Sequence, residues 1–313
     1  MKRVWLFPGQ GSQEPGMGDE LLRDEPAAAD LCRRAGERLG VDLRRLMADG
    51  PRASLAATAV AQTAIFALSV ATAGLLGTRG LRPVAVAGHS LGQFSAAVAC
   101  GALDVDTALD LVVARGRLMH EVNQRVDGGM LAVAAPSDGP WREVLDRAAA
   151  QVWIANRNAP GQTVLAGLLP DLRRLYPALA ATGARLSWLQ VAGPYHTPLF
   201  AEASARFDAL LEAAQWHAPC CPLLGNADGR TLEHADDLRQ EFLGHMLRPV
   251  DWVATMAGMG QLGVDGAVEV GPGRTLKGLA LRQLPHLRCV GTGTAAERQA
   301  LLAHDEETAC ALS

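Results

Sequence analysis

Short apolar runs alternate with longer helix-like stretches in the first part of the chain. Residues 4–7 and 84–87 are apolar runs of the length of a buried strand, and each leads into a loop that contains glycine. The stretches 61–76, 91–100 and 105–123 predict helices. Because strands that alternate with helices favour a parallel sheet covered by helices, this pattern predicts an α/β fold.

The pattern changes after residue 127, where strand-like and helix-like runs become densely spaced. They fit a compact α/β unit of roughly 65 residues. Strands are expected at 130–135, 152–155, 163–167 and 185–189, and helices at 141–149 and 169–181. A late apolar run, 267–270, precedes Gly271-Pro272-Gly273 and a further helix, and it resumes the first pattern. We therefore predict a small domain, 127–192, inserted in a large domain made of 1–126 and 193–313.

One stretch could cross a membrane by length alone, because no charged residue occurs between Arg52 and Arg79. It is rich in alanine and threonine, contains Gln62 and lacks a flanking belt of aromatic residues. These features favour a helix buried in the core and no membrane insertion.

The cysteines and the net charge indicate the cellular compartment and the kind of partner. The first apolar run is far too short for a signal peptide. No CxxC pair occurs among Cys32, Cys100, Cys220, Cys221, Cys289 and Cys310. This usage is typical of reduced thiols in a cytoplasmic protein. The formal net charge of -4 argues against a nucleic-acid partner.

Gly88-His89-Ser90-Leu91-Gly92 is a GxSxG sequence between a predicted strand and a predicted helix. This is the setting of a nucleophile elbow, in which two glycines permit a tight turn that exposes the serine hydroxyl. The N-terminus of the following helix favours negative charge that develops nearby. We identify Ser90 as the candidate nucleophile.

A serine nucleophile needs a base, and eight histidines are available. His89 is adjacent to Ser90 and points elsewhere, which makes it a poor base. His196 lies in a loop before a predicted helix, a good place to direct a ring into a cleft. Most of the others are expected in polar or loop-like surroundings: His217, His234, His245, His286 and His304.

Two further features fit acyl chemistry. The backbone N–H of Leu91 is the natural first donor to an oxyanion, and the loop 8–13 could supply a second. That loop could instead bind a nucleotide, but it matches neither GxxxxGK[ST] nor GxGxxG. Arg115 lies in an otherwise apolar helix pattern. It is either a residue on a solvated face or a clamp for a carboxylate.

Eight motifs occur in order along nearly the whole chain. They are FPGQGSQ at 7–13, VAQTA at 60–64, GHSLGQFS at 88–95, RGRLM at 115–119, NRNAPGQTVLAG at 156–167, GPYHTPL at 193–199, RPVDW at 248–252 and EVGPGRTL at 269–276. This series resembles the malonyl-CoA:acyl-carrier-protein transacylases and the related acyltransferase domains of polyketide synthases. The resemblance implies an α/β-hydrolase-like large domain with an inserted ferredoxin-like small domain.

The resemblance also implies a role for each matching residue. Ser90 would carry the acyl group, His196 would be its base and later its acid, and Arg115 would bind the free malonyl carboxylate. The backbone carbonyl of Asp251 would orient His196, in place of the acidic residue of a triad. The other implied site residues are the oxyanion donors Gln10 and Leu91 and the cleft residues His89, Asn158, Gln162 and Tyr195.

The implied activity is ping-pong transfer of a malonyl or related acyl group between coenzyme A and a phosphopantetheinylated acyl carrier protein, without metal or redox cofactor. Gln93-Phe94 stands where Glu-Tyr is usual, and Asp251 where Arg is usual, so the acyl selectivity stays open. Tyr195 stands where Phe is common, and by analogy it favours malonyl over its branched methyl homologue.

Several alternatives remain open. One is a discrete acyltransferase of a specialised polyketide pathway that moves another acyl group between carrier proteins. A second is the malonyltransferase subunit of a malonate decarboxylase, and a third is an esterase or thioesterase. A non-catalytic scaffold would lack Ser90 or His196, and this chain has both.

Overall fold

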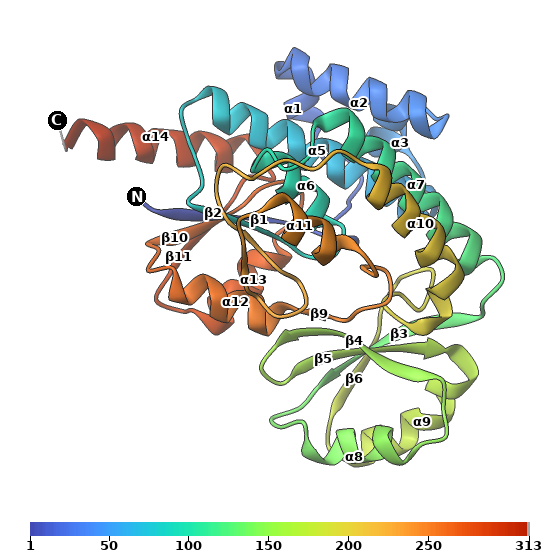
Figure 1. Ribbon diagram of the computed structural model, residues 1–313. Coiled ribbons are helices and arrows are strands. Elements are labelled where there is room, and N and C mark those ends of the chain that lie inside the picture. Colours follow the sequence, from blue (N-terminus) through green and yellow to red (C-terminus); the bar gives the residue numbers. More distant parts are fainter. Residues whose placement is uncertain (312–313) are drawn as a thin grey trace.

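Two sheets and the helices around them form the computed structural model of the chain (Figure 1). It describes residues 1–311, with backbone alone for 305–311. Figure 1 shows the smaller sheet below the larger one, with β9 at the junction. The expected combination of a helix-covered parallel sheet with a smaller inserted α/β unit is therefore observed.

The larger sheet has its strands in the order β11-β10-β1-β2-β7-β8, and only β7 and β8 pair in antiparallel fashion. Every residue of β1 and β2 is buried, because helices cover both faces of the sheet, and this explains the apolar runs at 4–7 and 85–88. The strands are β1 (Arg3–Phe7), β2 (Ala85–Gly88), β7 (Leu223–Leu224), β8 (Thr231–Leu232), β10 (Gly266–Glu269) and β11 (Arg288–Gly291).

The helices of this part include α5, the charge-free stretch, which packs against α2, α6 and α7. By length and composition α5 could cross a membrane, but 72% of its most apolar window is buried inside the protein, which confirms the expected core helix. The helices are α1 (Asp19–Asp24), α2 (Pro26–Leu39), α3 (Leu43–Asp49), α4 (Arg52–Ala56), α5 (Thr58–Thr78), α6 (Gly92–Ala99), α7 (Val105–Asn123), α10 (Ala201–Ala213), α11 (Ala235–Phe242), α12 (Trp252–Gln261), α13 (Thr275–Gln283), α14 (Ala295–Ala311) and a 3-10 turn, Pro198–Phe200.

The smaller sheet has the strand order β6-β3-β5-β4-β9. Its chain order β3-α8-β4-β5-α9-β6 is the ferredoxin-like arrangement. The elements are β3 (Gly128–Ala134), α8 (Gly139–Arg147), β4 (Val152–Ala159), β5 (Gln162–Leu168), α9 (Leu169–Ala181), β6 (Arg185–Trp188) and β9 (Val250–Asp251). The last of these comes from the segment assigned to the large domain and pairs in parallel with β4. The domain boundaries at 127 and 192 stay a prediction.

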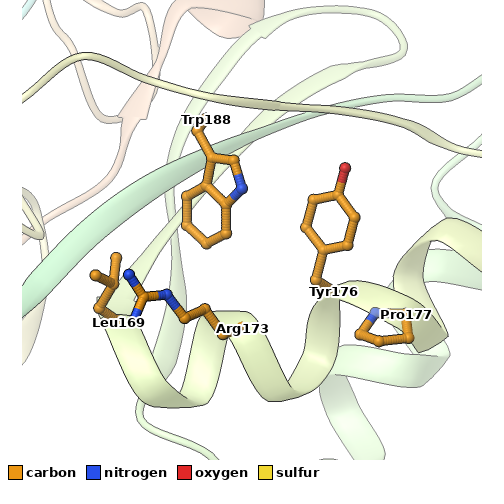
Figure 2. A pocket seen from close by; sticks show the side chains of 5 residues that line it. All are labelled: Leu169, Arg173, Tyr176, Pro177 and Trp188. Carbon is orange, nitrogen blue, oxygen red and sulfur yellow. The ribbon is translucent and has the colours of Figure 1, made fainter.

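An open hollow of about 430 Å³ lies between β6 and α9 (Figure 2). Its rings, Tyr176 and Trp188, are nearly parallel at 9°, with centroids 6.0 Å apart, and Arg173 extends beside them. No serine, cysteine or histidine lines this hollow. It therefore offers none of the groups expected for acyl transfer, and the candidate site must lie elsewhere.

The cysteines whose side chains the structure describes are all free: Cys32, Cys100, Cys220, Cys221 and Cys289. This agrees with the expected reduced thiols. The side chain of Cys310 lies outside the described part of the chain.

Candidate active site

Ser90 occupies the turn between β2 and α6, as expected for a nucleophile elbow. Its φ is 52°, in the left-handed region that a side chain with Cβ rarely adopts. Among residues 1–311, His196 is the one other non-glycine residue with a positive φ, at 59°. Strained backbone of this kind gathers at functional sites, and here it marks the predicted nucleophile and the predicted base.

Glycines make the elbow possible because backbones approach closely around it. A Cβ on Gly88 would lie 2.0 Å from the carbonyl carbon of Gly92, and a Cβ on Gly92 would lie 2.0 Å from the carbonyl oxygen of Phe7. A Cβ on Gly9 would lie 2.5 Å from the carbonyl oxygen of His89. No side chain fits at these distances, so the loop 8–13 can pack directly against the elbow.

His196 is placed as the base of Ser90. Its Nε2 lies 2.8 Å from the Ser90 Oγ, and its Nδ1 lies 2.8 Å from the carbonyl oxygen of Arg248. Because a carbonyl only accepts hydrogen bonds, Nδ1 carries the proton and Nε2 is free to accept the proton of Ser90. The ring is 5% exposed.

The prediction that the Asp251 carbonyl orients His196 is wrong, since the carbonyl that binds His196 belongs to Arg248. Asp251 lies in β9, where its position is set by pairing with Arg157 of β4. Its carboxylate accepts from the backbone N–H of Ala254 and caps α12, and its carbonyl accepts from the Thr255 hydroxyl. The segment that leads into β9 lies beside His196 at Arg248, three residues before Asp251, so Arg248 supplies the carbonyl.

The electrostatic environment keeps His196 neutral. Burial lowers the pKa of its imidazole to about 3, and the positive charge of Arg115 acts in the same direction. A neutral imidazole is the form that can accept a proton from a serine hydroxyl.

The acylation rate is therefore expected to change little between neutral pH and about pH 5 on account of this group, and to fall as the pH approaches about 3, where the imidazole becomes protonated. Rapid mixing of enzyme with acyl donor after a pH jump, read by intact mass, measures this profile. An inflection at the ordinary histidine value of 6.5 would contradict the assignment.

Arg115 is a buried cation next to the nucleophile. The side chain is 1% exposed; Nη1 donates to Gln62 Oε1 at 2.7 Å and Nη2 donates to Ser90 Oγ at 3.1 Å. Burial lowers the pKa of the guanidinium to about 10, so it stays charged at neutral pH. Its Nε has no hydrogen-bond partner, and no described Asp or Glu forms an ion pair with it. The site thus holds a positive charge whose natural complement is a carboxylate.

The two backbone donors of the predicted oxyanion hole have no acceptor. Neither the Gln10 nor the Leu91 N–H makes a hydrogen bond within residues 1–311, whereas the N–H of Ser90 donates to Asn226 Oδ1 at 2.8 Å. Leu91 precedes α6, so its N–H is one of the unpaired groups at a helix N-terminus. These donors fit the expected oxyanion hole.

The remaining predicted residues surround one cavity of about 800 Å³, which eight of the ten candidates line. His89 Nε2 lies 3.0 Å from Asn158 Oδ1, and burial lowers the pKa of His89. Tyr195 is fixed through its hydroxyl, 2.7 Å from the Thr58 hydroxyl. The lining candidates are Gln10, His89, Ser90, Arg115, Asn158, Gln162, Tyr195 and His196.

Sequence reasoning missed several residues of the site. His245 was expected in polar or loop-like surroundings; it does lie in a turn, but its side chain is buried beside the site. It is 4% exposed, and its ring lies parallel to Phe242 and 6.0 Å from His196. Gln62, which holds Arg115, could have been noticed as an amide inside an apolar helix. Asn226 gave no signal, because its partners are backbone atoms far away in the sequence.

Comparison with known proteins places this geometry in a family. The family model described as "Acyl transferase domain" matches residues 4–246. The malonyl CoA-acyl carrier protein transacylase of Synechocystis sp. is 34% identical over 293 residues, which are 94% of this chain and 97% of that protein. The transacylase of Escherichia coli K12 is 33% identical over 283 residues, 89% of this chain and 92% of that protein.

Solved structures of malonyl transacylases are similar to this chain over nearly its whole length. A malonyl-transacylase in complex with a type II polyketide synthase acyl-carrier protein matches with a TM-score of 0.92 and 32% identity, covering 97% of this chain and 100% of that chain. The transacylase of Xanthomonas oryzae matches with a TM-score of 0.91 and 34% identity, covering 97% and 99% of the two chains.

Proposed function

Since the chain belongs to the acyl transferase domain family, we propose that it transfers a malonyl group from coenzyme A to an acyl carrier protein through an ester on Ser90. The single observation that supports malonyl over a neutral acyl group is Arg115, a buried guanidinium without a carboxylate partner, 3.1 Å from the Ser90 hydroxyl. A malonyl thioester carries both the carbonyl that Ser90 attacks and the carboxylate that Arg115 lacks.

In the first half-reaction the Ser90 Oγ attacks the thioester carbonyl while His196 Nε2 takes its proton. The oxyanion that forms accepts hydrogen bonds from the N–H groups of Gln10 and Leu91. The intermediate then expels the sulfur of coenzyme A, which receives the proton from His196. The malonyl group is left as an ester on Ser90.

The second half-reaction reverses these roles. The phosphopantetheine thiol of the carrier protein gives its proton to His196 and attacks the Ser90 ester. The same two backbone donors stabilise the second oxyanion, and Ser90 leaves as a hydroxyl after it recovers the proton from His196. Because Arg115 contacts the distal carboxylate in both steps, the group can be handed over without leaving its binding site.

Arg115→Ala is expected to reduce malonyl transfer strongly, by about 2–5 kcal/mol in transition-state free energy, because one side of a buried charge pair is lost. Transfer of acetyl or longer neutral groups should be unchanged or improved. Kinetics with malonyl, methylmalonyl and acetyl donors, each on coenzyme A and on carrier protein, measure this selectivity. The methylmalonyl arm also tests whether Tyr195 excludes the branched homologue.

Arg117→Ala is the matched control, since Arg117 lies on the exposed face of the same helix and donates to the Arg38 carbonyl oxygen. It should leave selectivity unaltered. If the wild-type enzyme does not react with malonyl-CoA but accepts a larger acyl group from a carrier protein, the malonyl proposal is wrong. That result would favour the specialised acyltransferase. Release of free acid without an acceptor would favour a thioesterase.

We further propose that the enzyme acts in the cytoplasm, where coenzyme A thioesters and carrier proteins meet. The free described cysteines support this compartment. Fractionation of cells that express a tagged chain tests the proposal.

A further inference from the structure

The N–H of Ser90 is not free for catalysis, because the side chain of Asn226 holds it. Asn226 Oδ1 accepts from the Ser90 N–H at 2.8 Å, and Asn226 Nδ2 donates to the carbonyl oxygen of Gly88 at 2.5 Å. One amide therefore bridges two backbone groups on either side of the elbow. Asn226 is 4% exposed, so water does not compete for these bonds.

The backbone of Asn226 is fixed by two further hydrogen bonds. The N–H of Asn226 donates to Glu241 Oε1 at 2.7 Å, and its carbonyl oxygen accepts from the Asp251 N–H at 2.7 Å. A second amide, Gln93, supports the same turn: its Oε1 accepts from the Gly88 N–H, and its Nε2 donates to the Leu224 carbonyl oxygen. Asn226, just after β7, and Gln93, in α6, thus support the elbow from two directions.

These contacts form a closed network that includes both Ser90 and His196. Ser90 bonds to Asn226, Asn226 to Glu241, and the Arg248 guanidinium to the Glu241 carbonyl oxygen. The Arg248 carbonyl then accepts from His196, whose other nitrogen faces Ser90. Nucleophile and base are oriented by one connected set of side chains and backbone groups.

We propose that Asn226 is a positioning residue, which fixes Ser90 in its left-handed conformation and sets its hydroxyl against His196. The amide satisfies both bonds at any pH, because it accepts at one atom and donates at the other without a change of protonation. Its loss frees the Ser90 backbone to relax from a φ of 52°, which moves the Oγ away from Nε2. A displacement of about 1 Å in such a site costs about 100-fold in rate.

The test uses Asn226→Asp, which keeps the volume and the acceptor and loses the donor. The ionised carboxylate faces the Gly88 carbonyl oxygen, whereas the protonated form can donate to it again. Burial raises the pKa of such a carboxyl above its ordinary value. The acylation rate of Asn226→Asp should be reduced about 100-fold at neutral pH and should rise as the pH falls, with the apparent Kd for malonyl-CoA unchanged.

Other titratable groups around this side chain are His196, Glu241, His245 and Arg248. Burial lowers the pKa of His196 and of His245, so neither explains a rise in rate towards acid. Burial raises the pKa of Glu241, and the wild type, measured at the same pH values, controls for its titration.

Thr255→Val is the matched structural control. The Thr255 hydroxyl is buried and donates to the Gly225 carbonyl oxygen at 3.0 Å, next to Asn226 and without contact to the elbow. It should lower the melting temperature and leave the single-turnover rate and its pH profile unchanged. An equal loss in Thr255→Val and Asn226→Asp, or a loss in Asn226→Asp without recovery in acid, would overturn the positioning role.

This inference rests on the proposed Ser90–His196 dyad but not on the malonyl group. Labelling by a serine-directed fluorophosphonate therefore serves as a second readout, because it needs the activated serine and no acyl selectivity. If labelling of Asn226→Asp is slow and recovers in acid while malonyl-CoA proves a poor substrate, the substrate proposal fails and the role of Asn226 stands. If labelling is as fast as in the wild type, the role of Asn226 falls.

Discussion

Ser90→Ala is expected to abolish the acyl-enzyme and to reduce acyl transfer by roughly 10⁴- to 10⁶-fold, as loss of the nucleophile does in serine enzymes. The variant should fold, because alanine removes a single oxygen, whose partners are His196 and Arg115. Intact-mass spectrometry after incubation with malonyl-CoA measures the covalent intermediate directly. Circular dichroism measures the fold.

Ser95→Ala is a matched control on α6, the helix that follows the elbow. The Ser95 hydroxyl is buried and has no hydrogen-bond partner, so its removal should leave the acyl-enzyme intact. If the Ser90→Ala protein still gains the malonyl mass, another residue is the nucleophile and the assignment is wrong.

His196→Ala is expected to slow acylation by a similarly large factor, roughly 10⁴- to 10⁶-fold, because the hydroxyl loses its only base. Binding of malonyl-CoA should persist, since Arg115 keeps its bond to Gln62. Single-turnover acylation at saturating donor separates the chemical step from binding.

His217→Ala provides the comparison, because His217 is exposed and lies outside the cleft. It should retain the wild-type rate. Similar losses in His196→Ala and His217→Ala would show that His196 has no special role.

Local patterns were sufficient to predict the elements that carry the chemistry. The run that ends at Gly88 and the helix after Leu91 required a turn between them, and two glycines made that turn identifiable. Arg115 was ambiguous between a clamp and a solvated residue, since a helix pattern does not reveal which neighbours cover a face. Its 1% exposure decides for the buried position.

Contacts between distant segments could not be predicted in the same way. The carbonyl that orients His196 was expected to be that of Asp251 and belongs to Arg248, because the pairing of β9 with β4 sets the local register. His245 appeared loop-like in sequence, yet the chain folds it against Phe242. Asn226 is recognisable only once β7 lies beside β2, so that its amide reaches the backbone of Gly88.

The uncompensated guanidinium of Arg115 has a consequence for the energy profile of the cycle. In the free enzyme a buried positive charge lacks its counter-ion, which makes the resting state electrostatically unfavourable. In the proposed reaction the malonyl ester on Ser90 brings that counter-ion with it and keeps it there by a covalent bond. The loaded enzyme is then expected to melt at a higher temperature than the free enzyme, because the folded state alone gains the ion pair.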